Sequence, residues 1–370
     1  MAVQIRRDLG FDESGVGFAF AAFFGMASLA SAPLGKLTER GGPVRSLRVA
    51  AIVSGTACLV TAAFSRSLPT LIAPLAVAGA SNALCQPAAN LLIARALPPE
   101  RQGFAFAVKQ SAIPMATLLA GASVPLLART VGWQGGFVFA AVLSFASAAF
   151  VPRLAIEGLS LESRPDGVPT ADVPFRVMAV LAIGIGFGAA AAGTLGSFLV
   201  SAAVDGGWSE SSAGWLLTGG SLAGICVRVF AGMRADRRAG GHLRVVALML
   251  TAGTAVFVLL SIHEPWAYLV AGPLGFCTAW AWPGLFNLAV VRANPARPAA
   301  ATGITQTGTY IGAVSGPLLF GVLAERTSFP TAWLAAAGFA LVGAAAMTEG
   351  RRRLRAWRAN AVPPVDPIPA

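Results

Sequence analysis

Long apolar blocks alternate with short polar segments along almost the whole chain. A helix rises about 1.5 Å per residue, so about 20 residues cross the roughly 30 Å of hydrocarbon in a bilayer. Glycine and proline recur inside the blocks, and membrane helices tolerate both better than soluble helices do. The pattern therefore predicts eleven membrane-spanning helices, at residues 15–35, 46–65, 70–95, 103–128, 133–153, 175–203, 212–233, 244–262, 266–291, 299–323 and 329–347.

Composition supports this interpretation, because 56% of the residues are hydrophobic and only 12% are charged. In soluble domains about a quarter of the residues are charged. We therefore predict an all-α polytopic membrane protein surrounded by a lipid bilayer.

The net charge of +11 is distributed unevenly between the two sides of the predicted helices. When the loops are assigned alternately outside and inside, starting outside, 20 Lys and Arg residues fall on the inner side and 5 on the outer side. Such a bias is typical of membrane proteins, whose cytoplasmic loops are rich in Lys and Arg. It predicts a multi-pass plasma-membrane protein with a cytoplasmic C-terminus, and it explains the charge without a nucleic-acid partner.

Several short motifs return at one fixed offset of 197 residues. Separate matches at the same offset are hard to obtain by chance, so they indicate a tandem duplication of a unit of roughly 200 residues. The matched pairs include Glu13 and Glu210, Gly35 and Gly232, Arg40 and Arg237, Asn90 and Asn287, and Pro98 and Pro295.

The duplication predicts two pseudo-symmetric helix bundles, with five spanning helices in the first and six in the second. Subtracting 197 from the block at 175–203 places its counterpart at about −22 to 6. We therefore expect twelve helices in a full-length form, which either starts upstream of Met1 or has been truncated, and we favour the upstream start. The charged residues 1–13 then form an outer loop. The predicted parts are an N-terminal bundle at 1–153, a cytoplasmic linker at 154–174, a C-terminal bundle at 175–348 and a basic cytoplasmic tail at 349–370.

The most specific motif follows the block at 15–35 and reads Gly35-Lys36-Leu37-Thr38-Glu39-Arg40-Gly41-Gly42. Its second copy is Gly232-Met233-Arg234-Ala235-Asp236-Arg237. Together with the two bundles and the polar linker, this loop resembles the Gly-x-x-x-Asp-Arg-x-Gly-Arg/Lys signature of the major facilitator superfamily of secondary transporters. The first copy departs from that signature at two positions. Glu39 stands in place of the Asp, and the final basic residue comes later in the chain, at Arg45.

The resemblance covers the chain except for one helix, and it implies transport by alternating access between the bundles. It also implies a role for the loop as a latch that stabilises the outward-facing state. Carried over by position, the latch residues are Gly35, Glu39, Arg40, Gly232, Asp236 and Arg237. The alternative is a turn that only sets topology.

The resemblance further implies that the family's first, fourth, seventh and tenth helices line the substrate cavity. Asn82, Gln86 and Asn90 lie at i, i+4 and i+8 and so share one helix face. Trp280 and Trp282 lie on the counterpart helix. We expect Gln86 and Trp280, followed by Asn82 and Trp282, to line the cavity. Asn90 repeats in both copies, which favours helix packing for it.

Two cations lie inside predicted helices, and all sixteen Asp and Glu residues lie in loops, tails or at helix rims. Lys109 is eight residues beyond Arg101, and Arg228 is eight residues before Asp236, each roughly 12 Å along the helix axis. An ionisable residue at that depth indicates function by default. We expect Lys109 and Arg228 to favour an anionic substrate or to gate it. The alternatives are snorkelling to the surface and, for Arg228, support of the Asp236 loop.

Glycine and proline add expectations about packing. Gly308, Gly312 and Gly316 form a GxxxGxxxG run, which favours close helix packing over a drug-efflux signature. Pro87 and Pro283 lie at nearly equivalent points and predict kinks.

The leading function is therefore transport of a small solute, with a small organic anion as the expected substrate. Drug efflux, a non-transporting sensor and an inactive truncated transporter are the alternatives. An enzyme is disfavoured because no convergent nucleophile and base occur at membrane depth. The isolated His242 and His263 give no ligand cluster, so we expect no metal, no catalytic residues and no cofactor. We expect a monomer.

Overall fold

The computed structural model describes residues 2–11, 13–123, 132–151, 172–238 and 240–361. Within these ranges the chain is built of helices, and no strand is present. Ten helical segments are long and apolar enough to span a bilayer, with α10 and α11 counted together. An eleventh long helix, α5 (Pro99–Ser123), is not among those ten. The predicted linker at 154–174 falls almost entirely outside the described residues.

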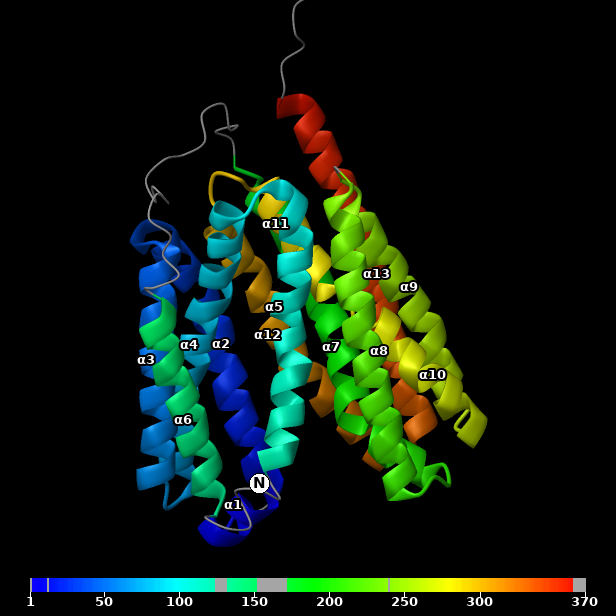
Figure 1. Cartoon of the computed structure of the whole chain (residues 1–370). Helices are drawn as coiled ribbons and strands as arrows, with labels where there is room; N and C mark the ends of the chain where they lie inside the picture. Colours follow the sequence, from blue (N-terminus) through cyan, green and yellow to red (C-terminus); the bar gives the residue numbers. More distant parts are fainter. Residues whose placement is uncertain (1, 12, 124–131, 152–171, 239, 362–370) are drawn as a thin grey trace, which may run out of the picture.

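The helices form two bundles that stand side by side (Figure 1). The first contains α2 (Glu13–Gly41), α3 (Pro43–Phe64), α4 (Leu68–Ala96), α5 and α6 (Trp133–Phe150). The second contains α7 (Phe175–Asp205), α8 (Glu210–Asp236), α9 (His242–Leu260), α10 (Pro265–Thr278), α11 (Pro283–Ala293), α12 (Pro298–Arg326) and α13 (Phe329–Ala361). The predicted all-α polytopic fold with two bundles is thus confirmed.

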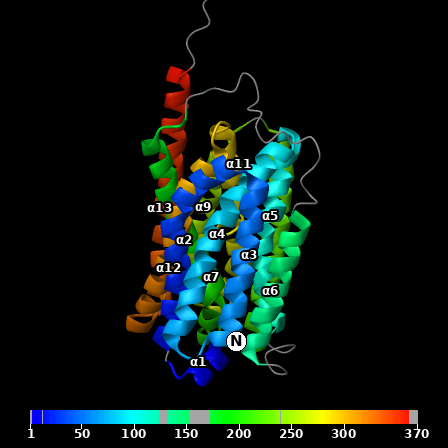
Figure 2. The same ribbon diagram turned by 90° about the vertical axis from the view of Figure 1, so that its left-hand side faces the viewer.

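Two pairs of helices make most of the contacts between the bundles: α2 lies along α12, and α5 lies along α8. In the view turned by 90° the first bundle lies in front of the second, and the helices of both run in roughly the same direction (Figure 2). At one end α2 ends, α5 begins and α13 ends, and we call this the closed end because cross-bundle contacts gather there. The ribbons of the two bundles diverge toward the opposite end, where α1 (Ala2–Leu9) lies (Figure 1).

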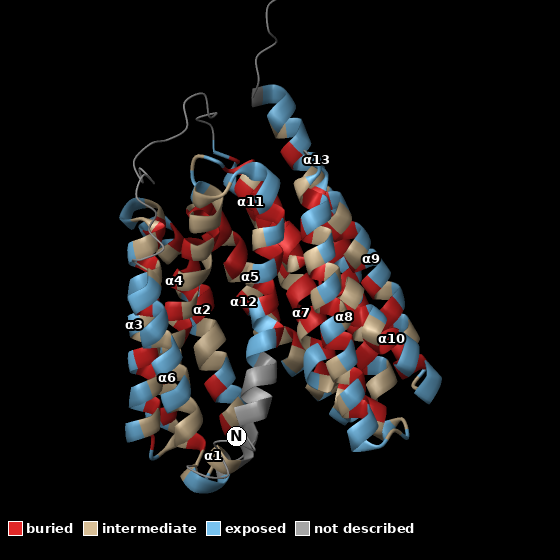
Figure 3. Cartoon of the chain, in the orientation of Figure 1, coloured by how far each residue is buried: buried red, intermediate tan, exposed pale blue. Residues whose placement is uncertain are grey.

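Buried residues are concentrated in the second bundle, above all along α7 and α11 (Figure 3). α7 packs chiefly on α12 and α13. Gly308 and Gly312 of α12 make this approach possible, because a Cβ there would lie 2.0 Å and 1.9 Å from carbonyl oxygens of α7. The predicted role of the glycine run in close packing is therefore confirmed.

Three expectations need correction. The block at 266–291 is not one helix: residues 279–282 are a turn between α10 and α11, because Pro283 has no N–H to continue the helical ladder. The last helix does not end at 347 but runs to Ala361, supported by ion pairs from Glu349 to Arg352 and Arg353. The outer loop at 1–13 contains α1, which ends at Leu9 and is followed by Gly10 with φ of 68°.

Candidate functional site

Lys109 of α5 reaches α4 inside the first bundle. Its ammonium donates hydrogen bonds to the amide oxygens of Gln86 and Asn90, both at 2.6 Å. Among the described residues no carboxylate lies within salt-bridge distance of Lys109. The cation is therefore held by dipoles alone, an arrangement that leaves its charge available to an anion.

The surroundings of Lys109 contain polar atoms that the protein does not satisfy. Nδ2 of Asn90 and Oε1 of Gln110 are buried and have no hydrogen-bond partner within the described part of the chain. A buried donor or acceptor without a partner is costly. Nδ2 of Asn90 is a donor, so an oxyanion at Lys109 could satisfy it.

The polar face of α4 continues toward the α1 end. Asn82, one turn from Gln86, donates to the hydroxyl of Tyr310 on α12 at 3.2 Å. Tyr310 is 4% exposed, and its ring lies 6.2 Å from that of Phe24. Asn82 therefore joins the two bundles, and a line of polar groups runs from Tyr310 to Lys109.

Arg228 and Trp280 meet on the second-bundle side. The guanidinium of Arg228 is 5.3 Å from the centroid of the Trp280 ring, which is a cation–π arrangement. Arg228 also donates to the carbonyl oxygens of Trp280 and, across the bundle interface, of Gln110 at 2.6 Å. Arg228 is 3% exposed, so in this conformation it acts as a cross-bundle contact.

Trp282 does not lie in the cavity in this structure. It is 2% exposed and belongs to the hydrophobic core of the second bundle. A Cβ at Gly188 of α7 would lie 3.1 Å from its ring, and its Nε1 donates to the carbonyl oxygen of Ala279. The residue two positions away, Trp280, is only partly buried. The turn at 279–282 separates the two rings, a difference that the spacing of the two tryptophans does not predict.

Among the predicted latch residues, the two carboxylates differ from the two arginines in forming hydrogen bonds to the opposite bundle. Glu39 accepts hydrogen bonds from the backbone N–H groups of Ala299 and Ala300 at the start of α12, at 2.8 and 3.3 Å. Asp236 accepts from the N–H groups of Gly103 and Phe104 near the start of α5, at 2.5 and 2.8 Å.

Each carboxylate thus crosses to the other bundle and caps the positive end of a helix there. Glu39 also pairs with Arg95 at 3.1 Å. By contrast, Arg40 and Arg237 are exposed and take no part in these bonds.

Gly35 and Gly232 permit this contact. A Cβ at Gly35 would lie 2.7 Å from the carbonyl oxygen of Ala299, and a Cβ at Gly232 would lie 2.5 Å from that of Gly103. Arg292 adds a further bond from α11 to the carbonyl oxygen of Pro99. The bundles are therefore tied together at this end by backbone contacts and by two helix caps.

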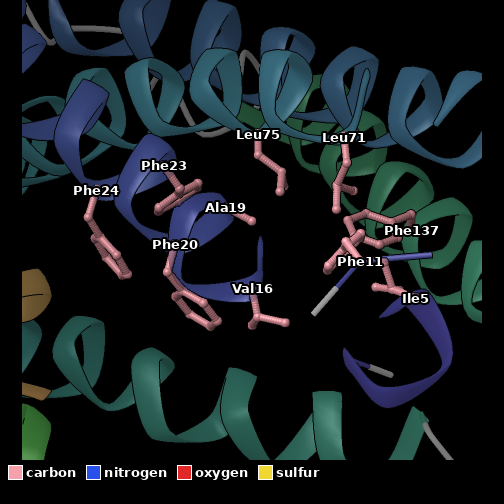
Figure 4. Close-up of a pocket in the computed structure, with 10 residues that line it drawn as sticks. All are labelled: Ile5, Phe11, Val16, Ala19, Phe20, Phe23, Phe24, Leu71, Leu75 and Phe137. Carbon is pink, nitrogen blue, oxygen red and sulfur yellow. The ribbon is translucent and has the colours of Figure 1, made fainter. Parts of the chain in front are cut away.

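An apolar groove opens in the first bundle toward the α1 end (Figure 4). It has a volume of about 370 Å³ and is lined by residues of α1, α2, α4 and α6, with Phe11 between the first two. A second cavity of about 340 Å³, with serine hydroxyls in its wall, lies between α2, α3, α4 and α6 and reaches Asn82 and Cys85. The lining of the first groove is Ile5, Phe11, Val16, Ala19, Phe20, Phe23, Phe24, Leu71, Leu75 and Phe137.

Sequence reasoning missed or undervalued three of these groups. It assigned Asn90 to interhelical hydrogen bonding, which the structure shows, but it did not identify the partner as Lys109. Tyr310 was overlooked, although it is one of only two tyrosines in the chain and sits inside an apolar block. Gln110 contributes a main-chain carbonyl, and the sequence signal for it is Pro114, which has no N–H to offer the carbonyl four residues before it.

Two helix bundles with polar groups at their interface are the arrangement expected of a membrane transporter. The family model of the Major Facilitator Superfamily matches residues 1–176 and 181–365. The chain therefore belongs to the Major Facilitator Superfamily.

Relatives and solved structures agree with this family. An uncharacterized MFS-type transporter of Mycobacterium tuberculosis is 29% identical over 260 residues, which cover 67% of this chain and 57% of that protein. The chloramphenicol resistance protein of Streptomyces lividans is 27% identical over 325 residues, covering 85% of this chain and 81% of that protein.

Two solved structures share the fold. The human organic anion transporter MFSD10 (TETRAN) matches with a TM-score of 0.71 at 18% identity, covering 93% of this chain and 87% of that chain. The transporter FucP in its outward conformation matches with a TM-score of 0.68 at 16% identity, covering 95% and 92%.

Proposed function

We propose that this protein carries a small organic anion across the plasma membrane by alternating access, with Lys109 as the anion-binding residue. The observation that carries the proposal is the ammonium of Lys109, which is held by the amide oxygens of Gln86 and Asn90. Among the described residues no carboxylate lies within salt-bridge distance of it. A carboxylate that binds there gains a charge-assisted hydrogen bond. Gln86 and Asn90 hold the ammonium, and the partly exposed Trp280 offers an apolar wall for the body of the substrate.

The closed end supports an assignment of the conformation. The positive-inside bias places this end in the cytoplasm. Glu39 and Asp236 cap helices of the opposite bundle at this end, so the conformation is outward-facing. Both caps must break before the substrate can leave to the inside. The same bias places the C-terminus in the cytoplasm. A monomer suffices, because both halves of the site lie in one chain.

Binding to the purified protein tests the proposal. Benzoate and octanoate serve as anionic probes, and benzamide is the neutral control of matched shape. We expect thermal stabilisation by the anions and not by benzamide. Lys109→Gln, which introduces the residue type of its symmetry partner Gln306, should weaken anion binding by about tenfold or more, since a hydrogen bond to a charged group contributes about 1.5–3 kcal/mol. Equal affinities in the wild type and Lys109→Gln would refute the anion site.

Drug efflux is the second candidate, and two observations favour it. The apolar groove of about 370 Å³ suits a lipophilic molecule, and a relative at 27% identity is a chloramphenicol resistance protein. Chloramphenicol, which is neutral, therefore belongs in the same titration. Stabilisation by chloramphenicol that persists in Lys109→Gln would favour efflux over anion transport.

A further inference from the structure

Arg228 is a buried cation with an unusual set of partners. It is 3% exposed, and its two hydrogen bonds both go to main-chain carbonyls, one in each bundle. Within the described chain no carboxylate lies in salt-bridge distance of it. A buried guanidinium held only by carbonyls and an aromatic face is poorly compensated, and loss of one acceptor is costly.

The interruption between α10 and α11 provides one of these acceptors. In a continuous helix the carbonyl of Trp280 would accept the N–H of Gly284. Residues 279–282 form a turn instead, so that carbonyl faces Arg228. Carbonyls freed at broken membrane helices commonly bind charged groups. Arg228 therefore fixes both the turn and the Trp280 ring above it.

The other acceptor belongs to the opposite bundle. Gln110 directly follows Lys109 in α5, so the carbonyl that Arg228 contacts lies one residue beyond Lys109 in the chain. When α5 separates from α8 at the closed end, the carbonyl of Gln110 moves away from Arg228.

Internal symmetry shows that this contact is not required by the architecture. The residue 197 positions before Arg228 is Ser31. At the corresponding interface of α2 with α12, the contact is a pair of hydroxyl-to-carbonyl bonds between Ser28 and Thr307, both at 3.3 Å. Small neutral side chains therefore make the contact between α2 and α12, and a buried cation makes the contact between α5 and α8.

We propose that Arg228 couples opening of the closed end to anion occupancy, so that the protein exchanges one anion for another and does not reorient empty. In the empty carrier, separation of α5 from α8 would strip Arg228 of the Gln110 carbonyl. In the loaded carrier, an anion bound at the adjacent Lys109 supplies the negative charge that replaces it. This coupling rests on the proposed anion transport.

Distance measurements between the bundles test the coupling. Spin labels at Arg45→Cys and Arg244→Cys, both exposed and on opposite bundles, report opening in a background lacking the four native cysteines. The labelled protein is reconstituted in liposomes and measured with and without benzoate. For the wild type we expect benzoate to raise the open population by about tenfold, the effect of one hydrogen bond to a charged group.

Arg228→Gln should open to the same extent with and without benzoate. Arg228→Lys, which keeps the charge but cannot bridge two carbonyls, should retain a reduced response. Asp236→Asn is the control for a merely loosened interface, because it weakens a helix cap and leaves Arg228 in place. It should raise the open population in both conditions and keep the tenfold ratio.

Each outcome separates the coupling from the anion transport on which it rests. If Arg228→Gln responds to benzoate by the wild-type ratio, the coupling is wrong while anion transport stands. If neither benzoate nor octanoate changes the wild-type population, the anion proposal fails and the coupling fails with it.

Discussion

At the scale of single residues, the chain distinguishes two tryptophans that its sequence presents as equivalent. Trp282 fills the core of the second bundle beside α7, and Trp280 lies partly exposed under Arg228. The difference follows from the turn at 279–282, which rotates the two side chains to different surroundings. Position in the sequence alone therefore does not assign a residue to the cavity.

Truncating each ring tests this assignment. Trp282→Ala should cost about 3–5 kcal/mol of stability, because it leaves a cavity in a packed core, and the variant should bind benzoate normally if it folds. Trp280→Ala should lose far less stability and should weaken binding. Thermal unfolding in detergent and benzoate titration measure both effects. If only Trp282→Ala lost affinity for benzoate, the assignment of Trp282 to the core and of Trp280 to the cavity would be wrong.

At the scale of elements, the closest helix pair is set by glycine. Gly312 of α12 faces the carbonyl oxygen of Gly186, and a Cβ would come within 1.9 Å of it. Backbone atoms cannot yield as a flexible side chain can, so the two helices would have to separate. This contact positions α7, whose other face carries much of the core of the second bundle.

Gly312→Ala should therefore destabilise the protein by about 1–3 kcal/mol, the usual cost of overpacking. Gly219→Ala in α8 is the matched control, since a Cβ there meets nothing within 4 Å. The control should be neutral or slightly stabilising. Thermal unfolding measures both, and equal melting temperatures would contradict the close approach.

Much of the element order could be predicted from the sequence, because apolar block length and the bilayer leave few alternatives. The polar groups around Lys109 could be predicted in part. The spacing of Asn82 and Gln86 predicts that they share one helix face, and the depth of Lys109 within its helix predicts a functional role for it. Its partners could not be derived, because the bond from Lys109 to Asn90 depends on how α4 and α5 are rotated against each other. For Arg228 the sequence marks one free carbonyl, that of Gln110, because Pro114 has no N–H to donate to it. That Arg228 reaches this carbonyl depends on how α5 and α8 pack.

At the scale of the whole molecule, the two bundles make similar contacts at the closed end, but their interiors are packed differently. Glu39 and Asp236, 197 residues apart, make equivalent caps on opposite bundles. Cys85 and Trp282 share the same offset, yet Trp282 packs against α7 and Cys85 borders a cavity of about 340 Å³. The shared residues serve the joint between the bundles, and the unshared ones, Lys109 and Arg228, supply the charge between them.

Transport by the reconstituted chain tests the central claim most directly. Proteoliposomes loaded with unlabelled benzoate are placed in labelled benzoate, and entry of label is compared between the wild type, Lys109→Gln and empty liposomes. Anion exchange predicts label entry in the wild type that depends on internal benzoate and falls about tenfold or more in Lys109→Gln, by the same charged hydrogen bond. Label entry equal in the wild type and Lys109→Gln, or no higher than in empty liposomes for benzoate and octanoate alike, would contradict the account.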